Sequence, residues 1–91
     1  MLTRVNEFVA KPGKENELAD FLSSLLPYIQ SCKGNRNCEL LRSEDDPLQF
    51  IVLEKWESKD AHQQSIDNYP KEKMAGVMPL LGAPPKGGWY R

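Results

Sequence analysis

The sequence predicts one α+β domain in which four strands form an antiparallel sheet and the helices cover one of its faces. Three observations support this prediction. Leu2–Ala10 alternates between two faces as a strand does, apolar residues recur at helical spacing after Gly13, and Leu48–Trp56 is the most strand-like run of the chain. All 91 residues are assigned to a single domain, because no linker, repeat or low-complexity tract divides them.

The first strand and the first helix are separated by a turn. Leu2–Ala10 ends at Lys11-Pro12-Gly13, where proline and glycine favour a change of direction. An amphipathic helix is expected next, because polar residues separate an apolar stripe formed by Leu18, Phe21, Leu22, Leu25 and Ile29. Pro27 lacks an N–H group and is expected to kink or loosen the last turn of this helix.

A hairpin is predicted in the middle of the chain. Cys38–Ser43 is a short strand, Glu44-Asp45-Asp46-Pro47 has the chemistry of a turn, and Leu48–Trp56 is the partner strand. This last strand is apolar on both faces, with Phe50, Val52 and Trp56 on one side and Ile51 and Leu53 on the other. Such a strand must be covered on both sides. We therefore expect helices over one face and a second copy of the chain over the other, which predicts a homodimer.

The second half of the chain supplies the remaining elements. Ser58 is a good N-cap, so a helix is expected over Lys59–Asn68. Pro70 is expected to start another helix, whose apolar stripe consists of Met74, Val77, Met78 and Leu81. Lys86–Arg91 is left for a final strand. The order strand, helix, strand, strand, helical segment, strand is the ferredoxin-like βαββαβ arrangement.

Composition excludes several classes of function. The 12 basic and 13 acidic residues nearly cancel and form no patch, so neither nucleic acid nor an anionic membrane is an expected partner. No apolar run approaches the length of a membrane span, so a soluble cytoplasmic protein is expected. The spacing of Cys32 and Cys38 fits neither a redox pair nor a zinc site, which favours two reduced structural thiols. The sequence contains no pattern for a metal, haem, flavin or nucleotide, and no cofactor is expected.

A partly polar pocket is predicted between the sheet and the helices that follow Trp56. His62, Ile66 and Tyr69 fall at i, i+4 and i+7 and are expected to share one helical face. The other walls of this pocket are predicted to be Asn6, Phe8, Trp56, Met74 and Met78. A single histidine can act as a base or a hydrogen-bond donor near neutral pH. Each residue also has a structural explanation: His62 as a solvated surface group, Trp56 and Tyr69 as packing anchors, Asn6 as an exposed strand residue, and the methionines as core.

Three segments carry a resemblance to a known family. They are Phe8-Val9-Ala10-Lys11-Pro12-Gly13-Lys14-Glu15, the stretch Glu54-Lys55-Trp56-Glu57-Ser58-Lys59-Asp60-Ala61, and Met78-Pro79-Leu80-Leu81-Gly82-Ala83-Pro84-Pro85. In this order and spacing the chain resembles the antibiotic biosynthesis monooxygenase family, whose members are small dimeric α/β barrel proteins. The resemblance implies a cofactor-independent monooxygenase that oxidises a quinol, an anthrone or a polyketide phenol with molecular oxygen.

The resemblance also assigns residues, with some departures. In anthrone-oxidising members the tryptophan of a Trp-Glu-Ser motif and a tyrosine six residues later line the pocket, and an asparagine precedes the tryptophan by four residues. Here these positions hold Trp56, His62 and Val52. The histidine that many quinol-type members carry nine residues after the tryptophan is Ser65 here. Asn6 resembles an asparagine of haem-degrading members, but their tryptophan and histidine would fall near Ser65 and Ala75, which disfavours haem degradation.

The expected roles follow from the resemblance. His62 is the candidate base or orienting group, Asn6 a polar contact, and Trp56 a pocket wall beside the substrate-binding Tyr69, Phe8, Met74 and Met78. Two alternatives remain open at this point: isomerisation or tautomerisation of a small carbonyl compound, and small-molecule binding without turnover.

Overall fold

The computed structural model describes residues 1–91 and contains one four-stranded antiparallel sheet with the order β2-β3-β1-β4. The elements, in chain order, are β1 (Leu2–Val9), α1 (Glu15–Ser31), β2 (Asn35–Arg42), β3 (Gln49–Trp56), α2 (Lys59–Asn68), α3 (Lys71–Ala75), the 3₁₀ turn η1 (Met78–Leu80) and β4 (Lys86–Tyr90). This order and topology confirm the predicted ferredoxin-like α+β fold. β1 lies at the centre between β3 and β4, so side chains from both ends of the chain meet on it.

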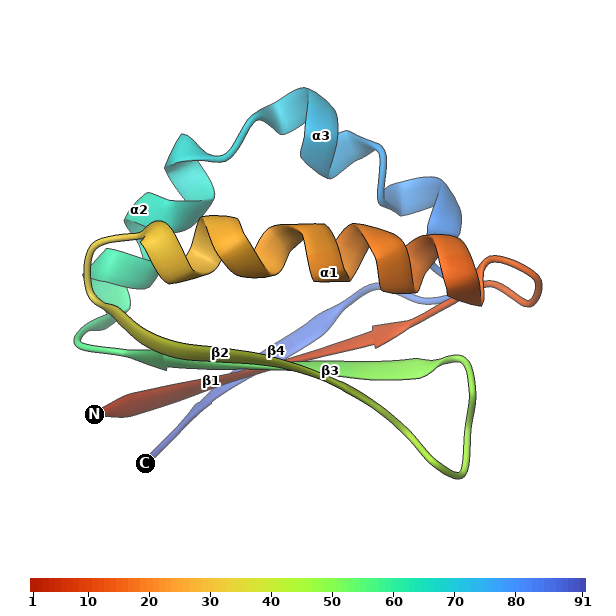
Figure 1. The fold of residues 1–91 in the computed structure, drawn as a ribbon, viewed down its shortest axis with the longest axis horizontal. Helices are drawn as coiled ribbons and strands as arrows, with labels where there is room; N and C mark the ends of the chain where they lie inside the picture. The colour runs from red at the N-terminus through yellow and green to blue at the C-terminus, as the bar shows by residue number, and fades with distance from the viewer.

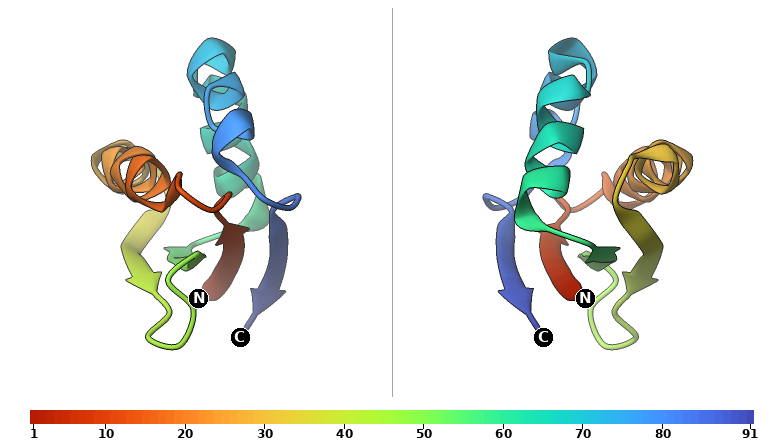
Figure 2. Two further views of the ribbon diagram at one scale, coloured as in Figure 1. Left: turned by 90° about the vertical axis from the view of Figure 1, so that its right-hand side faces the viewer. Right: turned by 90° about the vertical axis from the view of Figure 1, so that its left-hand side faces the viewer.

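All helices lie on one face of the sheet, as Figure 1 shows. Helix α1 runs along the sheet, whereas α2 and α3 rise away from it (Figure 2). The hydrophobic core lies between the sheet and this helical layer. Its largest fully buried side chains are Trp56, Phe50, Leu18, Leu22 and Val52. None of the helices combines the length and the apolar character that crossing a bilayer requires.

Sequence and structure agree closely for several elements. Helix α2 has the predicted bounds, and the Ser58 hydroxyl accepts a hydrogen bond from the Ala61 N–H at 3.1 Å, as expected of an N-cap. The strand predicted over Cys38–Ser43 begins three residues earlier, at Asn35, because the segment after α1 also pairs with β3. Helix α1 continues for four residues beyond Pro27.

The second half of the helical layer differs from the prediction. The apolar stripe expected after Pro70 is divided: Val77 and Leu81 are buried in the core, but the side chains of Met74 and Met78 are 41% and 59% exposed. The reason is that the segment forms a five-residue helix and a separate 3₁₀ turn, so helical spacing does not hold across it. Neither methionine is therefore a buried pocket wall of this chain.

The face of the sheet opposite the helices carries apolar side chains with no covering element. Ile51 and Leu53 of β3 point to this face and are half-buried, and Leu41 of β2 and Tyr90 of β4 are 45% and 59% exposed. The predicted double-sided character of β3 is thus present, with one side inside the core and the other open.

Candidate functional site

A buried carboxyl group lies at the centre of the candidate site. Glu54 of β3 shares the helix-facing side of the strand with Val52 and Trp56, and it is only 5% exposed. One of its oxygens, Oε1, accepts a hydrogen bond from the indole Nε1–H of Trp56 at 2.7 Å. The other, Oε2, accepts one from the side-chain amide of Asn6 at 2.8 Å. Alternation along β3 and the pairing of β3 with β1 produce this arrangement.

Asn6 extends the polar chain to Arg4 on the same strand. The Arg4 Nε–H donates to the Asn6 Oδ1 at 3.0 Å, and the guanidinium lies 5.3 Å from the ring centroid of Trp89 on β4. Gly87 makes room for this group, because a Cβ atom at that position would lie only 2.7 Å from the Arg4 Cζ. Gly87, the second residue of β4, therefore has a packing function, because its missing side chain leaves room for the arginine.

His62 of α2 packs over this cluster between two tryptophans. Its ring meets Trp56 edge-on with centroids 5.5 Å apart and Trp89 with centroids 5.0 Å apart, and the residue is 8% exposed. The Nε2 atom lies 3.9 Å from the Glu54 Oε1, beyond hydrogen-bond distance. Neither ring nitrogen has a hydrogen bond within the chain, yet no fully buried side-chain nitrogen or oxygen lacks a partner. The imidazole nitrogens must therefore keep contact with the exterior.

Burial shifts the titration of both groups. The pKa of His62 is lowered to about 4, first because burial penalises the imidazolium and then because Arg4 repels it. Burial raises the pKa of Glu54, while the hydrogen bond from Trp56, the charge of Arg4 and the bond from Asn6 oppose the rise. His62 is therefore neutral at pH 7, and the expected titration near neutrality is replaced by one near pH 4.

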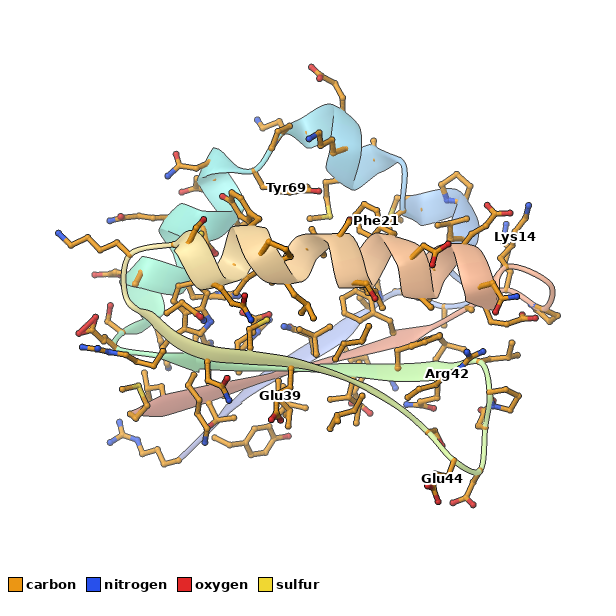
Figure 3. The ribbon with its side chains drawn as sticks, viewed as in Figure 1. Lys14, Phe21, Glu39, Arg42, Glu44 and Tyr69 are labelled. Carbon is orange, nitrogen blue, oxygen red and sulfur yellow. The ribbon has the colours of Figure 1, made fainter.

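A groove lies between α1 and the α2–α3 segment. It has a volume of about 630 Å³ and is lined by Phe21, Ser24, Tyr28, Tyr69, Pro70 and Lys73. Phe21 and Tyr69, from its two sides, are labelled in Figure 3. The rings of Tyr28 and Tyr69 meet edge-on with centroids 5.0 Å apart. The Tyr28 hydroxyl donates to the Ser65 carbonyl oxygen at 2.6 Å, so this wall of the groove is attached to the helix that carries His62.

A smaller pocket of about 170 Å³ lies beside the cluster. It is lined by Leu2, Lys59, Trp89, Tyr90 and Arg91. Trp89 is the shared element, since its ring also packs against His62. No three histidine, cysteine, aspartate or glutamate side chains are grouped so as to hold a metal ion. Both cysteines are free, and burial raises the pKa of Cys38 to about 12.

The structure brings three of the predicted site residues together. Asn6, Trp56 and His62 meet around Glu54, which joins two of them directly. Tyr69 lines the groove instead. Phe8 is partly buried against the core. The face predicted to combine His62, Ile66 and Tyr69 is corrected, because Ile66 is 48% exposed and the inward positions of α2 are His62 and Ser65.

Glu54 and Tyr28, like Arg4 and Trp89, were missed from the sequence. Glu54 is not among the predicted site residues, although strand alternation alone places it on the same face as Val52 and Trp56. Tyr28 lies among the polar and apolar residues of α1, and only the packing of α1 against α2 reveals its bond to Ser65. The first omission had a usable signal in the sequence, and the second had none.

Comparison with known proteins gives a consistent result. The model of the family described as antibiotic biosynthesis monooxygenase matches residues 1–68. No curated protein matches the chain.

Solved structures share the fold over the full length. A protein of Nitrosomonas europaea provisionally named an antibiotic biosynthesis monooxygenase superposes with a TM-score of 0.91 at 18% identity, covering 100% of this chain and 97% of that one. A second protein of the same organism, of unknown function, gives 0.84 at 29% identity, with 98% and 85% covered. A protein of Shewanella oneidensis gives 0.86 at 26% identity, with 98% and 87% covered.

Proposed function

We propose, since the chain belongs to the antibiotic biosynthesis monooxygenase family, that it is a cofactor-independent monooxygenase of a small aromatic hydroxyl compound. The expected substrate is a quinol, an anthrone or a related phenol, and the second substrate is molecular oxygen. The observation that carries this proposal is the convergence of Asn6, Trp56 and His62 on the inner face of the sheet, with both imidazole nitrogens free of partners within the chain.

The groove between α1 and α2–α3 is the proposed entry for the aromatic ring. Its volume falls within the usual range for small-molecule sites, about 300–1,000 Å³. Phe21, Tyr28 and Tyr69 offer three aromatic walls, and an edge-to-face contact with a substrate ring is favourable beyond the area it buries. Lys73 adds a positive charge at the rim, which favours a phenolate over the neutral phenol.

The chemistry implied by the family needs little from the protein. Loss of a proton converts the phenol into an electron-rich phenolate, which transfers one electron to oxygen; the radical pair combines, and the peroxide loses water to leave a quinone. The protein contributes deprotonation, orientation and exclusion of water. His62 is the proposed hydrogen-bond partner of the reacting hydroxyl. A phenolate beside the ring would raise the pKa of His62 from its value of about 4 in the free protein.

The low pKa of His62 also favours a second candidate function, small-molecule binding without turnover. An imidazole whose conjugate acid has a pKa of about 4 is a weak base towards a phenol, whose ordinary pKa is about 10. The same weakness applies to isomerisation of a carbonyl compound, which requires a proton shuttle near neutral pH.

Oxygen consumption separates these functions. Purified protein is mixed with a panel of hydroquinones and anthrones under air and under nitrogen, and oxygen uptake and quinone formation are followed. A monooxygenase consumes oxygen and forms quinone only under air, an isomerase forms product without oxygen, and a binding protein forms none. His62→Ala is expected to lower turnover by about 10²-fold. Gln64→Ala, at an exposed position two residues further along α2, is expected to leave turnover unchanged. Equal turnover in both variants contradicts the role of His62.

A homodimer is the proposed assembly, with the open sheet face as the interface. Leu41, Ile51, Leu53 and Tyr90 form an apolar surface there that the helices do not reach. Burying it against a second copy is expected to remove more than about 1,000 Å² from solvent. Light scattering should therefore give twice the 10.4 kDa chain mass, and Leu53→Glu should give the single mass. A monomer of wild-type protein at micromolar concentration contradicts the assembly.

A further inference from the structure

Glu54 is a buried acid that the proposed roles of Asn6, Trp56 and His62 leave unexplained. A carboxyl group with 5% exposure loses most of its hydration, and such a group is retained only when hydrogen bonds or a function compensate for that loss. No lysine or arginine forms a salt bridge with Glu54, and the only basic side chain with a nitrogen within 4 Å of its carboxyl oxygens is that of His62.

Both hydrogen bonds that reach Glu54 come from donor groups. Arginine can only donate, so the Arg4 Nε–H fixes the Asn6 amide with its oxygen towards Arg4 and its NH₂ towards Glu54. The indole of Trp56 can also only donate. Both carboxyl oxygens therefore accept, and an ionised carboxylate, which has only acceptors, satisfies both bonds.

The distance to His62 leaves room for one further bond. The 3.9 Å between the Nε2 and Oε1 atoms exceeds a normal N–H···O hydrogen bond by roughly 1 Å. The imidazole makes T-shaped contacts with both Trp56 and Trp89, and it has no competing hydrogen-bond partner within the chain. A small shift of the ring would place its Nε2–H on the carboxylate.

We propose, as a deepening of the proposed function, that Glu54 is the positioning residue and proton acceptor of this site and that it acts on the substrate through His62. The substrate O–H bond breaks and its proton passes to the Nδ1 atom of His62, while the Nε2–H bond breaks and its proton passes to the Oε1 atom of Glu54. The negative charge moves from the carboxylate to the substrate oxygen. Protons and charge balance, and no redox change occurs in this step.

Electrostatics favour Glu54 as the resting place of the proton. The pKa of Glu54 is raised by burial, whereas that of His62 is lowered to about 4, so the carboxylate binds a proton more readily than the ring. The other charged or titratable groups around Glu54 are Arg4 on β1 and Cys38 on β2. Because Glu54 and His62 are close neighbours, they are expected to titrate as a coupled pair.

Proton NMR tests the pair without any substrate. The chain has one histidine and two tryptophans, so His62 gives one Cε1–H signal, and Trp89→Phe assigns the Trp56 indole N–H. We expect the Trp56 signal to move with a midpoint above 4.5, the ordinary value for glutamate, and the His62 signal to show a step at the same pH. A Trp56 signal that stays constant down to acid unfolding would overturn the proposal.

Variants then assign that step to Glu54. Both signals should lose it in Glu54→Gln and keep it in Glu57→Gln, a matched control at an exposed glutamate that pairs with Arg36 at 2.9 Å. Persistence of the step in Glu54→Gln overturns the proposal. If Glu54→Gln does not fold, the wild-type titration and the Glu54→Asp variant test the assignment instead. In Glu54→Asp the step should persist with a shifted midpoint. Loss of the step in Glu54→Asp overturns the proposal.

Kinetics separate this inference from the proposed function. With any phenol that the protein oxidises, Glu54→Gln should lower kcat by about 10²-fold with little change in KM and remove the acid limb of the pH profile. Glu54→Asp should restore part of kcat. Wild-type kcat in Glu54→Gln overturns the role of Glu54. If no phenol is oxidised, the proposed function fails, and the NMR titration still decides whether Glu54 and His62 share a proton.

Discussion

Gly87 is predicted to determine whether Arg4 can join the polar cluster of Asn6, Glu54 and His62, although the glycine itself contributes no side chain to that cluster. In Gly87→Ala the new Cβ would lie 2.7 Å from the Arg4 Cζ and 3.0 Å from the Asn6 Oδ1. The nearest atoms belong to the far end of the flexible Arg4 side chain, so this side chain gives way. The substitution therefore displaces Arg4 while every residue of the cluster remains present.

The expected cost follows from the contacts that Arg4 loses. Its hydrogen bond to Asn6 involves a charged group and is worth about 1.5–3 kcal/mol, and its contact with the Trp89 ring about 0.5–1 kcal/mol. Replacing glycine by alanine returns about 0.4–1 kcal/mol by restricting the unfolded chain. We expect a net loss of about 2 kcal/mol in the free energy of unfolding.

Urea unfolding at one fixed protein concentration measures this loss. Gly88→Ala is the comparison on the same strand, because its Cβ would point to the opposite face of the sheet, towards the Tyr90 ring at 3.3 Å or more, and would leave Arg4 in place; any cost that it has reports on the proposed dimer interface. The decisive comparison is a double-mutant cycle. In an Arg4→Met background Gly87→Ala should cost less than about 0.5 kcal/mol, and an unchanged cost there would refute the reasoning.

Three further predictions concern burial. The pKa of His62 should be about 4, so the stability that neutral His62 contributes is complete above pH 6.5 and is lost as the pH falls towards 4. His62→Gln should therefore lose less stability than the wild type over this pH range. An NMR titration midpoint near 6.5 for His62 would contradict this prediction. Cys38 should react with iodoacetamide at pH 8 far more slowly than Cys32, because it is buried and its pKa is about 12; equal rates by mass spectrometry would exclude this. Phe50→Ala should cost about 3–5 kcal/mol in urea unfolding, since its ring is 1% exposed, and a cost below about 1 kcal/mol would contradict its place in the core.

The sequence by itself determined the architecture, because local patterns carry the information that architecture needs. Alternation along Leu2–Val9 and Gln49–Trp56, the apolar stripe of α1 and the cap at Ser58 are each set by neighbours in the chain. The same alternation also contained the inward direction of Glu54. These features depend on the geometry of single strands and helices, which a sequence encodes at fixed spacing.

Tertiary structure alone decided what the site residues can do. The low pKa of His62 results from burial between Trp56 and Trp89 and from the charge of Arg4, and two of these three residues lie far from His62 in the chain. Helical spacing predicts that Met74 faces inwards, but α3 ends at Ala75 and the Met74 side chain is exposed. Proton affinity and exposure depend on distances between elements, and those distances exist only once the sheet has brought the two ends of the chain together.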